Sequence, residues 1–181
     1  MGRNKWRTLP LGGPLDPALR HWLTEPASLT ARCQRVCRDF QVRLLSVGKG
    51  EPLADEPALG RLAWVREVVL ECDGVPVIFA HTTLSTVVNG RLTRWLLRLG
   101  SRSLGSLLFS YAGFRREAIE YCRLDSRHLL FQRAAGLGVA ENYLWARRSM
   151  HRLGVQQVLV TEVFLPAITR LELKTPAEAG V

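Results

Sequence analysis

The sequence predicts an α+β fold: a single six-stranded antiparallel sheet with helices inserted between groups of strands. Two hairpins carry this prediction, because Asp73-Gly74 and Leu153-Gly154 each separate two apolar runs rich in β-branched residues. The chain also lacks the regular strand–helix alternation that a parallel sheet requires. Its 181 residues, 47% of them hydrophobic, suffice for one domain with a substantial core.

Two capping signals predict the first helices. Asp16 is a plausible N-cap, and Pro17 after it suits the first helical position, so a short helix is expected through Trp22. Ser28 then predicts the start of a second helix that runs through about Val36.

Later elements follow from periodicity and turn residues. Apolar residues at helical spacing predict a helix over 86–99 that ends at Gly100, and another helix is expected from about Ser103. Residues 125–141 fit no single element. The six expected strands cover residues 40–47, 62–72, 75–84, 114–124, 142–152 and 155–165.

The organisation that follows is one catalytic or binding domain with two loose ends. We expect a flexible arm over 1–14, a domain over 15–170 and a flexible tail over 171–181.

Charged residues occupy core positions on two of the expected strands. Side chains on a strand alternate between faces, so Trp64, Arg66 and Val68 share the face that packs on the core. A guanidinium keeps its charge, and burial without a partner is costly. Glu162 is likewise the single charge on its face of the strand over 155–165.

The first hairpin predicts what lies beside Arg66. If the Asp73-Gly74 turn is the whole loop, the ladder pairs Arg66 with His81. Two cationic groups on one inner face would form a cradle for an anion.

Two interpretations of these residues stay open on this pattern. Arg66 and Glu162 could form a buried ion pair, which stabilises a protein less than its geometry suggests. Alternatively they line a ligand site, since charged groups on a core face also mark such sites. His81 would be a satisfied core histidine unless Arg66 is functional.

The net charge of +9, from 25 Lys and Arg against 16 Asp and Glu, has two interpretations. One is a nucleic-acid partner, and the other is electrostatic steering of a small anionic substrate. The basic residues are spread along the chain, with no aromatic RNA-binding motif or helix-turn-helix pattern. We therefore favour substrate steering, and interpret the arginines between Arg91 and Arg102 as the solvated face of a helix.

Cysteine usage and hydropathy indicate the compartment. Four cysteines, Cys33, Cys37, Cys72 and Cys122, are ordinary for a reduced cytosolic protein, and no zinc-like spacing completes a metal site. No apolar run approaches the ~20 residues of a membrane helix, and no apolar region follows the basic N-terminus. We expect small buried thiols, no metal, no membrane insertion and a cytoplasmic location.

A set of short motifs in fixed order carries a family resemblance. From about Leu15 to Pro166 the chain resembles bacterial chorismate lyase (chorismate–pyruvate lyase). The motifs are Leu15-Asp16-Pro17, Trp22-Leu23, Ser28-Leu29-Thr30, Trp64-Val65-Arg66-Glu67, Cys72-Asp73-Gly74-Val75-Pro76, Leu99-Gly100, Leu104-Gly105, Arg147-Arg148-Ser149 and Thr161-Glu162-Val163-Phe164-Leu165-Pro166.

The resemblance implies a lyase that eliminates pyruvate from chorismate to give 4-hydroxybenzoate, the first committed step of ubiquinone biosynthesis. It implies six antiparallel strands with helices closing over an internal ligand pocket, a monomer, and no cofactor or metal. By carry-over, Arg66 grips the ring carboxylate, Glu162 bonds the ring hydroxyl, and Leu29 and Leu104 line the pocket. The competing hypothesis is a non-catalytic binding protein for an aromatic acid or nucleic acid.

Two positions depart from the family's pattern. Leu29 stands where methionine is familiar, which changes little because both side chains are apolar. His81 stands where arginine is familiar, and a histidine is cationic only part of the time near neutral pH. If His81 assists with the second carboxylate, activity is expected to be more sensitive to pH.

Overall fold

The computed structural model describes residues 5–8, 15–57, 59–85, 91–100, 102, 104, 108 and 113–171. It is built on a seven-stranded antiparallel sheet in the order β1-β2-β3-β7-β6-β4, with β5 also pairing with β6. The strands are β1 (Phe40–Gly50), β2 (Ala63–Cys72), β3 (Val75–Ser85), β4 (Arg115–Arg116), β5 (Glu120–Asp125), β6 (Tyr143–Leu153) and β7 (Gln156–Phe164).

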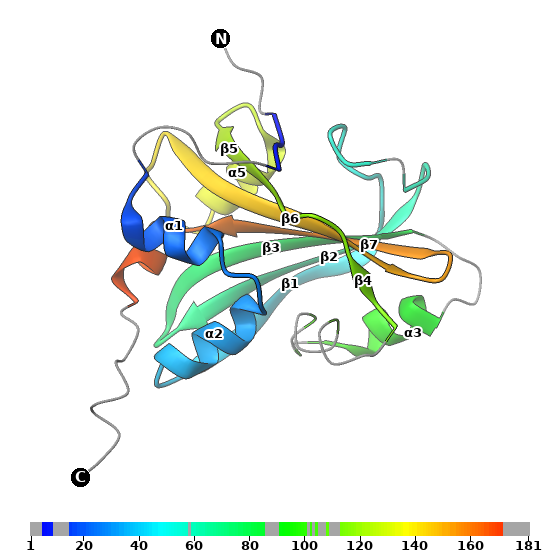
Figure 1. Cartoon of the computed structure of the whole chain (residues 1–181), viewed down its shortest axis with the longest axis horizontal. Coiled ribbons are helices and arrows are strands. Elements are labelled where there is room, and N and C mark those ends of the chain that lie inside the picture. The colour runs from blue at the N-terminus through cyan, green and yellow to red at the C-terminus, as the bar shows by residue number, and fades with distance from the viewer. Residues whose placement is uncertain are drawn as a thin grey trace.

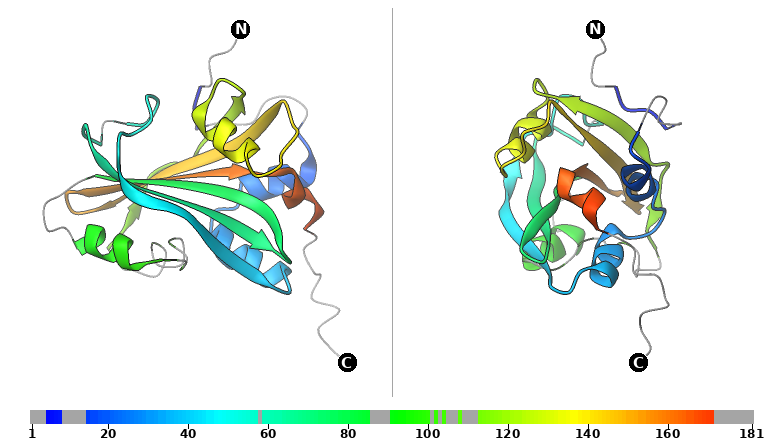
Figure 2. Two further views of the ribbon diagram at one scale, coloured as in Figure 1. Left: turned by 180° about the vertical axis from the view of Figure 1, so that it is seen from behind. Right: turned by 90° about the vertical axis from the view of Figure 1, so that its left-hand side faces the viewer.

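The sheet is strongly twisted and curled, so it has a concave and a convex face (Figures 1 and 2). The described helices are α1 (Pro17–Leu23), α2 (Leu29–Val36), α3 (Arg91–Arg98), α5 (Leu129–Ala135) and the 3₁₀ helix η1 (Pro166–Arg170). Two hydrophobic clusters cover the concave face, one beneath α1, α2 and η1 and one around Leu99 after α3. On the convex face lie α5 and the loop over 51–61.

Both predicted helix caps are confirmed. The Asp16 side chain accepts a hydrogen bond from the Leu19 N–H at the start of α1, and the Ser28 hydroxyl accepts one from the Ala31 N–H at the start of α2. The helix predicted over 86–99 is seen as α3, while residues 86–90 and most of the helix expected from Ser103 lie outside the described residues.

Both hairpins are also confirmed. Asp73 (φ 52°) and Gly74 (φ 78°) both have positive φ, as a two-residue type I′ turn requires. The second turn lies one residue later than predicted: it is Gly154-Val155 rather than Leu153-Gly154, with Leu153 and Gln156 as the closing pair.

A β-bulge on β3 changes the register that the first hairpin predicted. Cα partners run Glu71 with Pro76 and then Leu70 with Ile78, so Val77 is an extra residue. Pro76 has no N–H to donate to the ladder, which explains why pairing breaks there. A one-residue shift moves every later side chain to the other face.

The predicted pairing of Arg66 with His81 is therefore wrong. Arg66 pairs with Thr82, and His81 pairs with Glu67. Arg66 faces the concave side of the sheet, and His81 faces the convex side.

The predicted sheet of six strands is corrected to seven. The strand expected over 114–124 is two strands, β4 and β5, separated by three residues. Both pair with β6, and α5 follows them within the segment over 125–141 that fitted no single element.

Four residues of the predicted arm are described, and two of them contact the domain. Trp6 Nε1 donates to Asp55 Oδ2 over 2.6 Å, and Arg7 forms a β-bridge with Tyr121. The division into arm, domain and tail stays a prediction.

The cysteines differ from expectation. Cys37, the residue after α2, forms a disulfide with Cys72 at the end of β2, with their Cα atoms 5.3 Å apart. The expectation of four thiols is wrong for this pair, whereas Cys33 and Cys122 are free and buried. No helix in the described part of the chain is long and apolar enough to cross a bilayer.

Candidate active site

Arg66 is a buried cation on the concave face of β2. Its side chain is 2% exposed, and Nη2 donates to the carbonyl oxygens of Gly100 (2.8 Å) and Arg102 (2.9 Å). Among the described residues no acid pairs with it, and Nε is buried without a hydrogen-bond partner. Burial lowers the pKa of Arg66 to about 10. The guanidinium stays charged, so an anion from outside the chain would find a desolvated donor.

Glu162 faces the concave side from β7. Its Oε2 accepts a hydrogen bond from Arg147 Nε over 2.7 Å, and the two residues are direct partners across β6 and β7. Arg147 is 1% exposed and also donates to the carbonyl oxygens of Leu23 and Glu25. The ion pair between Arg66 and Glu162 is therefore wrong, because Arg147 is the partner of Glu162.

Leu29 and Leu104 lie at opposite ends of the concave face. Leu29 is buried in the cluster beneath α1 and α2. Burial, together with the charge of Glu162, raises the pKa of Cys33, one turn after Leu29, to about 12. Leu104 is buried in a cluster with Leu99, beside the carbonyls that hold Arg66.

Sequence reasoning missed a second polar group on this face. Arg116 of β4 donates from Nε to Ser149 Oγ (3.1 Å) and from Nη1 to the Pro26 carbonyl (2.6 Å). Ser149 Oγ lies 3.2 Å from His151 Nε2. Burial, together with the charge of Arg116, lowers the pKa of His151 to about 4, so this imidazole is neutral at pH 7.

The second hairpin could have predicted part of this polar group on the concave face. A two-residue turn at Gly154-Val155 without a bulge pairs Arg147 with Glu162, as the structure does. Alternation then places Ser149 and His151 on the same face as Arg147. Nothing in the pattern of β4 predicted Arg116, because a two-residue strand carries no periodicity.

His81 belongs to a different cluster on the convex face. Its Nδ1 lies 2.9 Å from Glu67 Oε1, its Nε2 lies 3.3 Å from Glu56 Oε1, and Thr83 Oγ1 contacts both His81 and Glu56. Burial lowers the pKa of His81, but the two carboxylates more than offset this, and the net shift is upward. Arg133 also pairs with Glu67, so the cluster is internally balanced.

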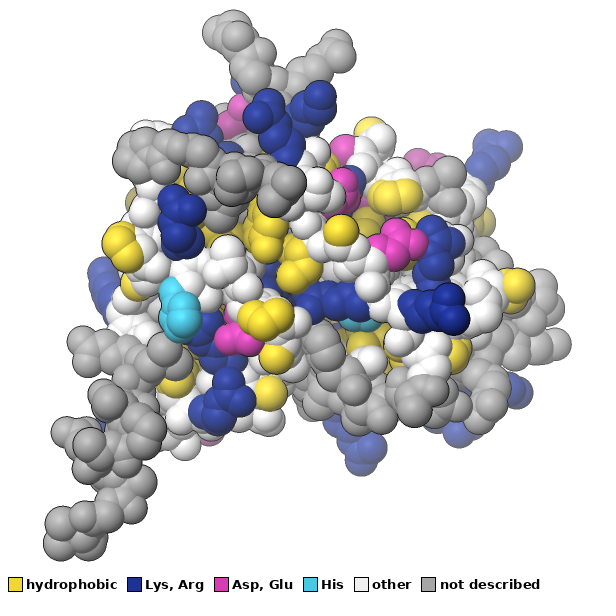
Figure 3. All heavy atoms as spheres, viewed as in Figure 1, with side chains coloured by type: hydrophobic (Ala, Val, Ile, Leu, Met, Phe, Trp, Pro, Cys, Tyr) yellow, Lys and Arg dark blue, Asp and Glu magenta, His cyan; other side chains and the backbone are white. Residues whose placement is uncertain are grey.

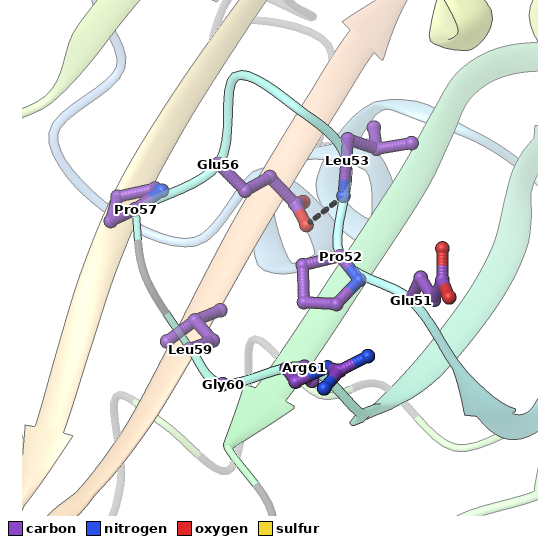
Figure 4. A pocket seen from close by; sticks show the side chains of 8 residues that line it. All are labelled: Glu51, Pro52, Leu53, Glu56, Pro57, Leu59, Gly60 and Arg61. Carbon is purple, nitrogen blue, oxygen red and sulfur yellow. Dashed lines mark hydrogen bonds between the residues drawn. The ribbon is translucent and has the colours of Figure 1, made fainter.

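The loop that carries Glu56 encloses a pocket of about 350 Å³ on the convex side (Figure 4). Glu56 turns inward and accepts a hydrogen bond from the Leu53 N–H over 2.9 Å. A second pocket, of about 520 Å³, lies between α1, η1 and the start of β6. Neither of these two pockets is lined by Arg66 or Glu162.

The surface and the metal-ligating groups add two observations. Figure 3 shows Lys and Arg side chains scattered over the face seen in Figure 1, which matches charge spread along the chain rather than gathered in one stripe. Within the described residues, no group of three His, Cys, Asp or Glu side chains is arranged to hold a metal ion.

A curled seven-stranded antiparallel sheet with helices packed on both faces places the chain in the α+β class. The fold is similar to the ligand-binding domain of a putative GntR-family transcriptional regulator from Bordetella bronchiseptica. The TM-score is 0.51 at 16% identity, over 71% of this chain and 85% of that one. This likeness concerns the fold alone.

Sequence comparison narrows the class to a family. The chorismate lyase family model matches residues 13–173. The chain is 67% identical over 176 residues to a probable chorismate pyruvate-lyase of Dechloromonas aromatica, covering 95% of this chain and all of that protein. It is 42% identical over 160 residues to a probable chorismate pyruvate-lyase of Methylobacillus flagellatus, covering 85% and 90%. The chain therefore belongs to the chorismate lyase family.

Proposed function

We propose that this protein is a chorismate pyruvate-lyase that converts chorismate to 4-hydroxybenzoate and pyruvate, the first committed step of ubiquinone biosynthesis. The observation that carries the proposal is Arg66: a buried cation without an acidic partner among the described residues, in a chain of this family. Such a group is costly unless it serves a ligand.

The proposed roles divide the concave face into two ends. Arg66 binds the ring carboxylate, with Leu104 beside it, and Glu162 accepts a hydrogen bond from the ring hydroxyl, with Leu29 beside it. The separation of the two charged residues supports this division. They lie on β2 and β7, two strand spacings apart and offset by two residues along the strands, so the Cα atoms are about 12 Å apart along the sheet. A para-substituted ring between two such side chains would fill an internal pocket that the helices close.

The chemistry asks for positioning and charge. The bond between the ring and the side-chain oxygen breaks. The C4 hydrogen leaves as a proton, and the side-chain methylene takes up a proton to become the methyl of pyruvate. The ring becomes aromatic, so the products are favoured, and no electrons pass to another molecule. Holding the reactive conformer beside preorganised cations is what the protein contributes. Glu162 either orients the 4-hydroxyl or accepts a proton.

Location, oligomeric state and ligands complete the proposal. We propose a cytoplasmic monomer whose partners are chorismate and its two products, without nucleic acid and without a cofactor. If helices must open for exit, 4-hydroxybenzoate release is slow and the product inhibits the enzyme. The alternative, a non-catalytic binding protein, gains no support from the family match.

One assay tests the proposal. Purified protein is mixed with chorismate in excess chelator, and 4-hydroxybenzoate absorbance is followed against a sample without protein. Catalytic formation of 4-hydroxybenzoate is expected. Absence of turnover together with salt-sensitive RNA binding would support the alternative instead.

A further inference from the structure

Arg147 joins two parts of the protein that are far apart in the sequence. From β6 its Nε donates to Glu162 Oε2 over 2.7 Å, and its Nη1 donates to the carbonyl oxygens of Leu23 and Glu25. Leu23 is the last residue of α1, so its carbonyl has no partner within that helix. A guanidinium is planar and rigid, and this arginine is 1% exposed. These bonds therefore fix the Glu162 carboxylate relative to the end of α1.

The end of α1 belongs to the cover over the Glu162 end of the concave face. Residues 24–28, here called the α1–α2 connection, lead from α1 to Leu29 at the start of α2. Leu23 and Leu29 are buried in one cluster with Phe164. Phe164 lies two residues after Glu162 on β7, so both side chains face the concave side. If α1 and α2 open to release a product, the connection moves with them and its bonds to β6 must break.

Arg32 of α2 is a second buried arginine that holds the connection. Its Nη1 donates to the His21 carbonyl over 2.8 Å and pairs with Glu25 Oε2 over 3.2 Å. It is 1% exposed, as Arg147 is. Among the described residues, no hydrogen bond or ion pair links Arg32 with Glu162. The two arginines are thus matched in burial and in their hold on the connection, and they differ in the contact with the carboxylate.

We propose that Arg147 is a positioning residue that couples closure of the α1–α2 connection to the orientation of Glu162. This inference rests on the proposed lyase function. With the connection closed, the carbonyl oxygens of Leu23 and Glu25 share one guanidinium with Glu162 Oε2, and Oε1 is left for the ring hydroxyl of the substrate. With the connection lifted, the guanidinium loses these two carbonyls and the carboxylate loses its fixed direction. The reaction is thereby confined to the closed pocket, where water is excluded.

Two rates separate the chemical step from opening. An acid-quenched single turnover with enzyme in excess measures 4-hydroxybenzoate whether or not it has left the protein, and displacement of bound 4-hydroxybenzoate gives its koff. In Arg147→Lys a single ammonium cannot span the carboxylate and both carbonyls, so we expect the single-turnover rate to fall about 30-fold and koff to rise about 10-fold. In Arg32→Met, the matched control, koff should rise about 10-fold while the single-turnover rate stays within about 3-fold of wild type.

A positioning residue acts through the group that it positions, and a double-mutant cycle tests this dependence. In a Glu162→Gln background there is no carboxylate to orient, so adding Arg147→Lys should change the single-turnover rate by less than about 3-fold. An arginine that only holds the fold would instead cost about 30-fold in both backgrounds. Urea denaturation of each variant establishes that folded proteins are compared.

Three results would overturn the inference. The first is an equal loss in both backgrounds, and the second is an unchanged single-turnover rate or koff in folded Arg147→Lys. The third is a loss of chemistry in Arg32→Met as large as in Arg147→Lys, because loosening the connection would then suffice. If Arg147→Lys does not fold, Arg147→Gln decides by the same comparison of backgrounds. Failure of the wild-type protein to turn over chorismate would instead remove the proposed function.

Discussion

Arg147 Nε donates to Glu162 Oε2 over 2.7 Å, between residues that face each other directly across β6 and β7. The arginine is fully buried, while the Glu162 side chain keeps 17% of its exposure. One carboxylate oxygen is thus fixed by the protein, and the other can accept a hydrogen bond from a ligand hydroxyl. The pair holds Glu162 in the orientation that the proposed site needs.

Replacing Arg147 should destabilise the protein. In Arg147→Met the Glu162 carboxylate loses its partner in a mostly buried position, so the free energy of unfolding is expected to fall by about 3 kcal/mol. Urea denaturation measures the loss. Arg127→Met is the control, since the Arg127–Asp125 pair is exposed to solvent and its loss should leave the stability nearly unchanged. Equal stability of the two variants would show that the buried pair does not hold the fold.

Glu162→Gln asks whether the carboxylate acts in the reaction. Glutamine keeps an oxygen that can accept from Arg147 and from a ligand hydroxyl, but it takes up no proton. We expect 4-hydroxybenzoate affinity to stay within about 5-fold and kcat to fall about 100-fold if the carboxylate is the base. Calorimetry and steady-state kinetics separate the two effects. Unchanged turnover would remove Glu162 from catalysis.

Arg66→Met should weaken binding strongly and spare the fold. The variant lacks the desolvated guanidinium that binds the ligand's ring carboxylate. We therefore expect 4-hydroxybenzoate to bind about 100-fold or more weakly. Methionine in a buried site has no charge to desolvate, so the stability of the ligand-free protein should not fall. Calorimetry and urea denaturation check the two statements, with Arg43→Met, from an exposed pair with Glu71, as control. Near-normal turnover by folded Arg66→Met would argue strongly against the proposed site.

Local patterns predicted the face of Arg66 correctly, because alternation along a strand depends only on that strand. The same patterns misplaced His81, since its face depends on the register between two strands. Pro76 interrupts the ladder and one bulged residue turns His81 to the other side. The second hairpin has no such interruption, but its turn lies one residue later than predicted, and only the observed turn places Arg147 opposite Glu162.

Other features were beyond the reach of local patterns. The Arg116–Ser149 contact joins β4 to β6 across 33 residues of sequence. The Cys37–Cys72 disulfide depends on how the end of α2 meets the end of β2, which no spacing specifies. Hairpins and caps are local and were found, whereas contacts between distant segments follow from the packed fold.

His81 gives the fold a dependence on pH. Its pKa is raised in the folded state, so it contributes stability that is fully present below its unfolded pKa of about 6.5 and is lost as pH rises through the folded pKa. In urea titrations between pH 5.5 and 9, the wild type should therefore lose stability relative to His81→Gln. At pH 6 the variant, which leaves two carboxylates facing each other, should be less stable by about 3 kcal/mol.

Catalysis supplies the control for His81. Because it faces away from Arg66, kcat/KM of folded His81→Gln should stay within about 3-fold of wild type at all pH values. A pH profile of kcat/KM that flattens in the variant would return His81 to the substrate site.

The disulfide predicts a stability that depends on redox state. Cys37 and Cys72 are separated by 35 residues, and closing a loop of this length stabilises the folded chain by about 3–4 kcal/mol in the chain-entropy model. Dithiothreitol should lower the free energy of unfolding by about this amount, and Cys37→Ser should make the protein insensitive to it. A thiol titration in denaturant should find the two free cysteines before reduction and four after. Alkylating the thiols in intact cells reports the redox state of the protein in its compartment. Four alkylated thiols would indicate a reducing compartment, in keeping with the proposed cytoplasmic location. Two alkylated thiols would contradict that location.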